Sequence, residues 1–104
     1  MIIRIFHVKV REGKDQEFEE FCRTIAFPLV KRHDGLRSVV AGKPLAGEPG
    51  MFCITMVWES IEALVKFAGD DWKAARIEPE EEHLVEAINV EHYDLFVASG
   101  GVEA

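Results

Sequence analysis

Two residues of this chain have side chains suited to moving a proton and to holding a negative charge. His7 lies within an apolar run, and a histidine has a pKa close to the pH at which a general base must work. Arg76 follows Trp72 by four residues, which places both side chains on one face if the segment is helical. We predict His7 as a catalytic base and Arg76 as the group that holds an anion. A hydrogen-bonded core histidine and a surface ion pair are the respective alternatives.

Aromatic side chains could complete a site around these two groups. A pocket for a flat organic molecule needs apolar walls with a few polar groups. We predict that such a molecule contacts Phe27, Phe67, Trp72 and His83. For the three aromatic residues, packing in the core is the alternative.

Metal ligands and cofactor motifs are sparse. Glu80 and His83 have the spacing of a metal-binding pair on a helix, but carboxylate-bridged sites need two such pairs. The sequence has no H-E-x-x-H, no phosphate-binding loop and no dinucleotide fingerprint. Cys22 and Cys53 lie in apolar surroundings and are expected to be small buried side chains. We predict no metal and no cofactor.

Size and charge limit the class of protein. A chain of 104 residues forms one domain, and 48% hydrophobic with 30% charged residues is typical of a globular one. The net charge of −7, without a basic stripe, argues against nucleic-acid binding. No apolar run is long enough to span a bilayer, and Arg4 interrupts the apolar start, which lacks a signal-peptide cleavage site. We expect a cytoplasmic protein with no membrane partner.

The first half of the chain predicts a strand and a helix. Residues 2–10 alternate as a strand, with Ile3, Ile5 and His7 on one face and with the other face lined by Ile2, Phe6, Val8 and Val10. A helix is expected from Asp15, with an apolar stripe formed by Phe18, Phe21, Cys22, Ile25 and Leu29. Pro28 should kink or divide this helix.

The second half predicts two strands, two helices and a last strand. Strands are expected at 36–41 and 51–58, followed by a helix that Ser60 caps and Gly69 ends. Pro79 should begin a short helix that carries Leu84, Val85 and Ile88. The final strand is expected at residues 91–98.

The resulting order is β-α-β-β-α-β, which predicts a ferredoxin-like α+β domain over residues 1–98 and a flexible tail at 99–104. Its sheet is antiparallel, with both helices on one face. The strands are apolar on two faces, although the helices can cover only one. We therefore expect a homodimer that packs through the sheet faces.

The stretch ITMVWESIEALVKF at residues 54–67, with the turn Trp72-Lys73-Ala74, resembles the antibiotic biosynthesis monooxygenase-like domains. In that family a tryptophan ends the third strand and a serine-capped helix follows. The resemblance implies a dimeric α+β barrel with a pocket between sheet and helices. The family includes cofactor-independent oxygenases of aromatic polyketides and quinols, and also haem-degrading enzymes.

The haem-degrading branch of that family uses an asparagine on the first strand, a tryptophan on the second helix and a later histidine. The corresponding places here are Phe6 or His7, then Phe67, then Arg76, and none of them matches. We therefore do not expect haem degradation. The resemblance implies a cofactor-independent monooxygenase of a small aromatic or quinol-type substrate. The alternative is a non-catalytic dimeric module that binds a small ligand or acts in an assembly.

Overall fold

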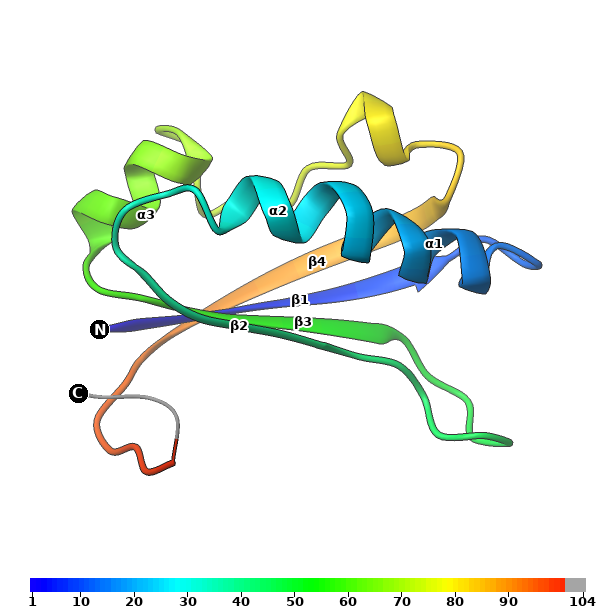
Figure 1. Cartoon of the computed structure of the whole chain (residues 1–104), viewed down its shortest axis with the longest axis horizontal. Coiled ribbons are helices and arrows are strands. Elements are labelled where there is room, and N and C mark those ends of the chain that lie inside the picture. The colour runs from blue at the N-terminus through cyan, green and yellow to red at the C-terminus, as the bar shows by residue number, and fades with distance from the viewer. Residues whose placement is uncertain (101–104) are drawn as a thin grey trace.

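The computed structural model of the protein describes residues 1–100 and shows a four-stranded antiparallel sheet with helices on one face (Figure 1). The sheet order is β2-β3-β1-β4, which confirms the predicted ferredoxin-like fold. Of the predicted tail, residues 101–104 lie outside the described part. None of the helices described is long and apolar enough to cross a bilayer. In chain order the elements are β1 (Ile2–Val10), α1 (Asp15–Phe21), the π-helical turn η1 (Cys22–Ala26), α2 (Phe27–Val30), β2 (Leu36–Gly42), β3 (Phe52–Trp58), α3 (Ile61–Ala68), the 3-10 turn η2 (Pro79–Glu81) and β4 (Val85–Asp94).

Strand β1 lies in the middle of the sheet and pairs with both β3 and β4. Its bounds are those predicted, and its side chains alternate between the two faces as expected. Phe6 and Val8 pack under the helices, whereas Ile5 and His7 point to the opposite face, which we call the outer face. Arg4 shares the helix-covered face with Phe6 and is 4% exposed.

The first helix is divided by the π-helical turn η1, immediately before the segment that contains Pro28. A proline in a regular α-helix lacks a donor, and its ring clashes with the carbonyl group four residues earlier, here that of Thr24. The wider turn accommodates both defects. The Thr24 hydroxyl donates to the Glu20 carbonyl at 2.8 Å. Beyond the turn, the buried side changes from Phe18 and Cys22 to Val30.

Helix α3 begins and ends as predicted. The Ser60 hydroxyl accepts a hydrogen bond from the Ala63 backbone N–H at 3.1 Å, and Gly69 ends the helix with φ +90°. Its Leu64 is fully buried against the sheet. The indole ring of Trp58 is also fully buried and stacks on Phe67, with ring centroids 4.9 Å apart.

The prediction for the end of the chain was wrong. Only residues 79–81 form a helical turn, and β4 runs from Val85 to Asp94, not over 91–98. Val85 and Ile88, expected on a helix, pair with Val10 and Val8 of β1. The bare edge of β1 satisfies backbone groups along this whole segment, which a short isolated helix could not do as well. After Asp94 the chain leaves the sheet, with one hydrogen bond from the Leu95 N–H to the Met1 carbonyl.

Candidate functional site

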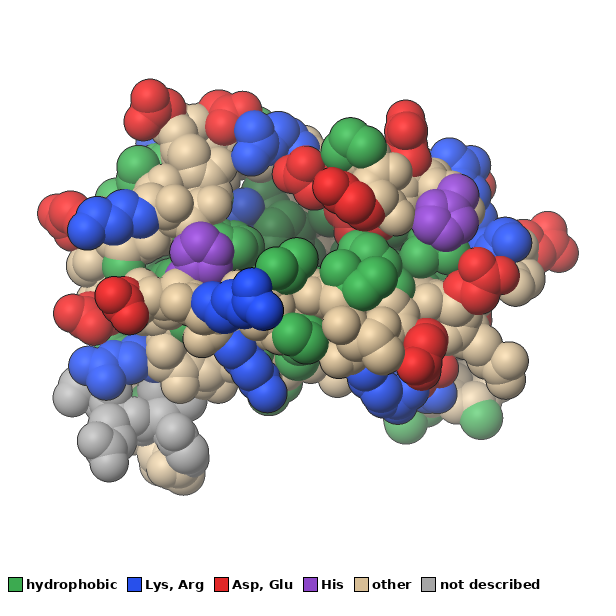
Figure 2. Space-filling model, turned by 45° about the horizontal axis from the view of Figure 1, so that its top comes forward, with side chains coloured by type: hydrophobic (Ala, Val, Ile, Leu, Met, Phe, Trp, Pro, Cys, Tyr) green, Lys and Arg blue, Asp and Glu red, His purple; other side chains and the backbone are tan. Residues whose placement is uncertain are grey.

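An apolar pocket of about 420 Å³ lies between the sheet and the segments that cover it. Phe6, Ile54 and Met56 line it from the sheet. Ile25 and Leu29 line it from the helix and remain 45% and 52% exposed, so they form an apolar lip. The third side is the segment that leads from α3 to β4. Figure 2 looks onto this side of the molecule and shows a hollow with hydrophobic side chains, with acidic side chains near it.

Arg4 is the one charged residue among those classed as buried in the described chain, and it lines this pocket. Its Nη1 donates to the Trp72 carbonyl at 2.7 Å and lies 2.9 Å from His92 Nε2. Because a guanidinium has no acceptor, His92 must accept here as a neutral imidazole. The guanidinium carbon lies 4.6 Å from the centroid of the Phe6 ring. Arg4 Nε is buried and has no hydrogen-bond partner within the described residues.

No carboxylate lies within ion-pair distance of Arg4 in residues 1–100. Burial, and to a smaller extent the charge of Arg76, lowers the pKa of Arg4 to about 10. The side chain therefore stays protonated at neutral pH. The same surroundings act on His92, whose pKa is lowered by burial and by the positive charges of Arg4 and Lys73. The floor of the pocket therefore holds a buried positive charge without a counter-ion.

The open side of the pocket carries charges of both signs. Arg76 donates to the Ala68 carbonyl at 3.1 Å and forms ion pairs with Asp71 at 3.4 Å and Glu78 at 3.9 Å. Glu81 also lines the pocket, and burial raises the pKa of its carboxyl group. One oxygen of that carboxylate accepts the Glu78 N–H at 3.1 Å, which fixes its position at the start of η2.

The structure brings some of the predicted site residues together. Phe27, Phe67 and Arg76 all line the pocket. Trp72 does not line the pocket, and its indole ring lies edge to face with the imidazole of His92, with ring centroids 4.8 Å apart. Trp72 and Arg76 do not share a helical face, because the chain between them is a turn followed by irregular backbone.

Two predicted site residues lie elsewhere. His7 does not line the pocket, because it is on the outer face of the sheet, 3.4 Å from Glu91. Its own alternation with Phe6 on β1 places it there. His83 is exposed and does not line the pocket either. Sequence reasoning missed Arg4 and Glu81. For Arg4 a signal existed, since it is a charged residue on the strand face that Ile2, Phe6 and Val8 share.

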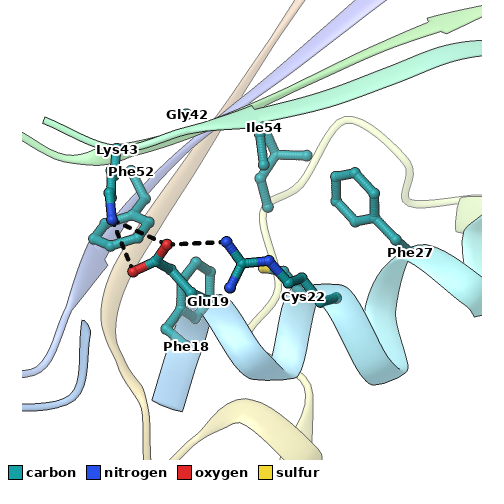
Figure 3. Close-up of a pocket in the computed structure, with 10 residues that line it drawn as sticks. Phe18, Glu19, Cys22, Phe27, Gly42, Lys43, Phe52 and Ile54 are labelled. Atoms are coloured by element: carbon teal, nitrogen blue, oxygen red, sulfur yellow. Dashed lines mark hydrogen bonds and ion pairs between the residues drawn. The ribbon is translucent and has the colours of Figure 1, made fainter. Parts of the chain in front are cut away.

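A second pocket, of about 460 Å³, lies on the other side of α1, next to β2 and β3 (Figure 3). Phe18, Phe27 and Ile54 line both pockets. At its edge Glu19 pairs with Lys43 at 3.0 Å and with Arg23 at 3.5 Å. One carboxylate faces two cationic side chains here, so this edge keeps a net positive charge.

The second pocket also contains a thiol. Burial raises the pKa of the Cys22 thiol to about 11, so that it is not a nucleophile at neutral pH. Elsewhere in residues 1–100, no three His, Cys, Asp or Glu side chains are grouped closely enough to hold a metal ion.

Comparison with known proteins decides the family. The model of the antibiotic biosynthesis monooxygenase family matches residues 1–76, which is most of the chain. The chain belongs to the antibiotic biosynthesis monooxygenase family. A search of curated proteins gives no match.

Solved structures of similar fold cover nearly the whole chain. The haem-degrader MhuD from Mycobacterium tuberculosis, solved with two haems in its active site, superposes with a TM-score of 0.73 at 19% identity, over 96% of this chain and 100% of that one. A candidate antibiotic biosynthesis monooxygenase from Deinococcus radiodurans gives 0.72 at 18% identity, over 96% and 97%. Another, from Bordetella bronchiseptica, gives 0.69 at 22% identity, over 92% and 97%. At these identities the likeness shows a shared fold.

Proposed function

We propose that this family member is a cofactor-independent monooxygenase of small phenol- or quinol-type aromatic substrates. The observation that carries the proposal is the pocket itself. It has aromatic walls, a guanidinium group at its open side and a carboxyl group whose pKa is raised. Such a combination suits the removal of a proton from an aromatic hydroxyl group and the stabilisation of the anion that forms. Membership of the family supports the same reaction class.

Each role belongs to a residue that lines the pocket. Glu81 takes the role of base that the sequence had suggested for His7, because it lies in the pocket and burial moves its pKa toward neutrality. Arg76 keeps the role of anion holder, since its side chain is 53% exposed and can turn toward a ligand. Phe27 and Phe67 hold the ring from the helix side.

The reaction balances with oxygen as the only co-substrate. Glu81 removes the hydroxyl proton, and the phenolate that forms is an electron-rich reductant. One electron passes from the phenolate to O₂, and the radical pair combines to give a peroxide at the ring carbon opposite the oxygen. Glu81 returns its proton to the outer oxygen of the peroxide. Loss of the C–H proton from that carbon then breaks the O–O bond and expels hydroxide, which takes up this proton and leaves as water. A phenol plus O₂ thereby yields a quinone plus water.

The test uses 1-naphthol and ¹⁸O₂. The proposal predicts 1,4-naphthoquinone that contains one ¹⁸O atom, with the second ¹⁸O atom in water. Glu81→Gln should reduce kcat by about 10²-fold or more, which is the usual contribution of a general base. Glu82→Gln is the matched control, because Glu82 is the next residue and does not line the pocket. Absence of labelled product would refute the proposal in favour of a non-catalytic binding module. Full turnover in both Glu81→Gln and Arg76→Gln would refute the roles given to these two residues.

Haem is the substrate to compare, because MhuD has the same fold. The haem-degrading branch has its asparagine, tryptophan and histidine at the places of Phe6 or His7, of Phe67 and of Arg76. Phe6, Phe67 and Arg76 line this pocket, and His7 does not. None of the three side chains offers a ligand for iron. We therefore expect that, when haem is added to the protein, the Soret absorption band does not shift as it does when a protein side chain ligates the iron. A shift of that kind would make haem the better candidate.

We also propose a homodimer through the outer face of the sheet. Ile5, Val40 and Val57 lie on this face, and Val40 is 59% exposed. Exposed apolar side chains on a sheet face without helices are typical of a dimer surface, and this face also carries the polar pair His7 and Glu91. Val40→Glu should give a monomer in light scattering. Leu45→Glu is the control, because Leu45 is 72% exposed but lies in the loop after β2. A dimer that survives Val40→Glu would contradict this interface.

A further inference from the structure

The buried guanidinium of Arg4 is not explained by the proposed reaction. Arg76 can hold the phenolate, and its own charge is offset by Asp71 and Glu78. Arg4 is 4% exposed, has no ion-pair partner and has a buried Nε with no acceptor in the described residues. A buried charge is normally paired, because removing it from water is costly. A buried, unpaired cation on the wall of a cavity therefore indicates that the counter-ion comes with the ligand.

We propose that the pocket recognises aromatic carboxylates, and that Arg4 binds the carboxylate while the ring occupies the apolar space under the lip of Ile25 and Leu29. This inference rests on the proposed function only in placing the substrate in this pocket. Two features of Arg4 favour a carboxylate. Nη1 is already engaged with Trp72 and His92, so the guanidinium is held in a fixed orientation. Both of its hydrogen bonds in the described structure leave from Nη1, so Nε and Nη2 have no acceptor there. A carboxylate that displaced the side chains covering the buried Nε would bring one oxygen to each of these two donors.

Charge at the open side restricts the ligand further. Glu78, Glu80 and Glu81 line the pocket together with Arg4 and Arg76. A ligand with one negative charge can place it on Arg4 and keep a neutral body near these glutamates. A second carboxylate at the far end of the ligand would face these three glutamates and only one arginine, Arg76, which is unfavourable in a site with little water. The pocket should therefore prefer monocarboxylates to dicarboxylates.

The decisive experiment measures binding and needs no turnover. Titration calorimetry compares 2-naphthoate with 2-naphthamide, which has the same ring and nearly the same size but no charge. We expect the carboxylate to bind roughly tenfold more tightly or better, since charge-assisted hydrogen bonds to a buried group exceed neutral ones. We expect 2,6-naphthalenedicarboxylate to bind more weakly than 2-naphthoate. Equal affinities for carboxylate and amide in the wild-type protein would overturn the inference.

Two variants test whether Arg4 causes the preference for carboxylate over amide. Arg4→Met removes the charge and fills a similar volume. This variant should bind the carboxylate and the amide with nearly equal affinity. Arg37→Met is the matched control. It makes the same change in net charge, but Arg37 is exposed, pairs with Glu59 at 3.9 Å and does not line the pocket. A folded Arg4→Met variant that keeps the preference would refute the role of Arg4.

A measurement on the wild-type protein covers the case in which Arg4→Met does not fold. The Nε–Hε signal of Arg4 in a ¹⁵N–¹H NMR spectrum should shift with 2-naphthoate and stay in place with 2-naphthamide. An unmoved signal at saturation would overturn the inference. The two proposals fail separately. Carboxylate preference without oxygen chemistry would refute only the monooxygenase, and turnover of 1-naphthol with no carboxylate preference would refute only the role of Arg4.

Discussion

Gly35 joins α2 to β2 and should be the glycine at which an added methyl group is most costly. Its φ is +89°, a region in which side chains are strained, and a Cβ built there would lie 2.5 Å from the Ala63 Cβ of α3. Gly13 separates these two effects, because its φ is +79° but a Cβ would meet nothing within 4 Å. Gly13→Ala should therefore report backbone strain alone, roughly 1–2 kcal/mol.

Gly35→Ala adds a steric clash to a similar strain. Overpacking of a tight contact costs roughly 1–3 kcal/mol, so the total loss should be about 2–5 kcal/mol. For a domain of this size that corresponds to a decrease in Tm of roughly 10–25 °C. Urea unfolding followed by circular dichroism measures the free energy, and the m-value should not change.

A double-mutant cycle tests the cause. Ala63→Gly removes the methyl group that the new Cβ would meet, so the pair Gly35→Ala and Ala63→Gly should be coupled by about 1–3 kcal/mol in the stabilising direction. Ala63→Gly alone should cost about 1 kcal/mol of helix propensity. The reasoning would be refuted if Gly35→Ala cost no more than Gly13→Ala, or if the cycle showed no coupling.

Three further predictions concern a cap, a histidine and a thiol. Ser60→Ala should lower the free energy of unfolding by about 1 kcal/mol, because the Ala63 N–H loses its acceptor. In the same urea assay, Ser60→Asp should keep most of the stability that the cap contributes. The folded pKa of His92 is lowered, so the unfolded chain binds more protons below pH 6.5 and stability should fall as the pH decreases through that range. His92→Gln should flatten this part of a stability profile measured from pH 7.5 to pH 5, and an unchanged slope would show that other groups cause it. Burial raises the pKa of the Cys22 thiol to about 11, so Cys22 should resist iodoacetamide at pH 8 in the folded protein and react with it in urea. Peptide mass mapping measures both reactions. Rapid labelling of the folded protein would contradict the burial of Cys22.

The sequence predicted the elements whose signals are local. The alternation in Ile2–Val10, the cap at Ser60 and the break before Pro28 depend on nearby residues, and each is present in the structure. The end of the chain was mispredicted because Pro79 and three glutamates satisfy the local rules for a helix start. Pairing of Val85 with Val10 depends on the edge of a strand far away in the sequence, which local rules do not include.

The site was predicted less well than the fold, for a related reason. Phe27, Phe67 and Arg76, chosen as aromatic and charged residues near a helix end, line the pocket, and their roles stay predictions. His7 was chosen for its chemistry, although its alternation with Phe6 placed it on the outer face. Arg4 was passed over because a charge in an apolar run suggested an interruption, and only the packing shows that it is buried. Residue type alone does not tell which face of a sheet becomes a cavity.

The π-helical turn η1 makes the pocket sensitive to the number of residues in the first helix as well as to their types. Each residue of an α-helix turns the chain by about 100°, so one residue more or fewer before Phe27 rotates everything that follows by that angle. Phe27, Leu29 and Val30 all line the pocket after the turn. A single-residue deletion within 22–26 would turn these side chains away from the pocket while leaving the composition of the helix nearly unchanged. In comparisons among relatives, a gap of one residue at this place should therefore indicate a differently shaped cavity more reliably than many substitutions would.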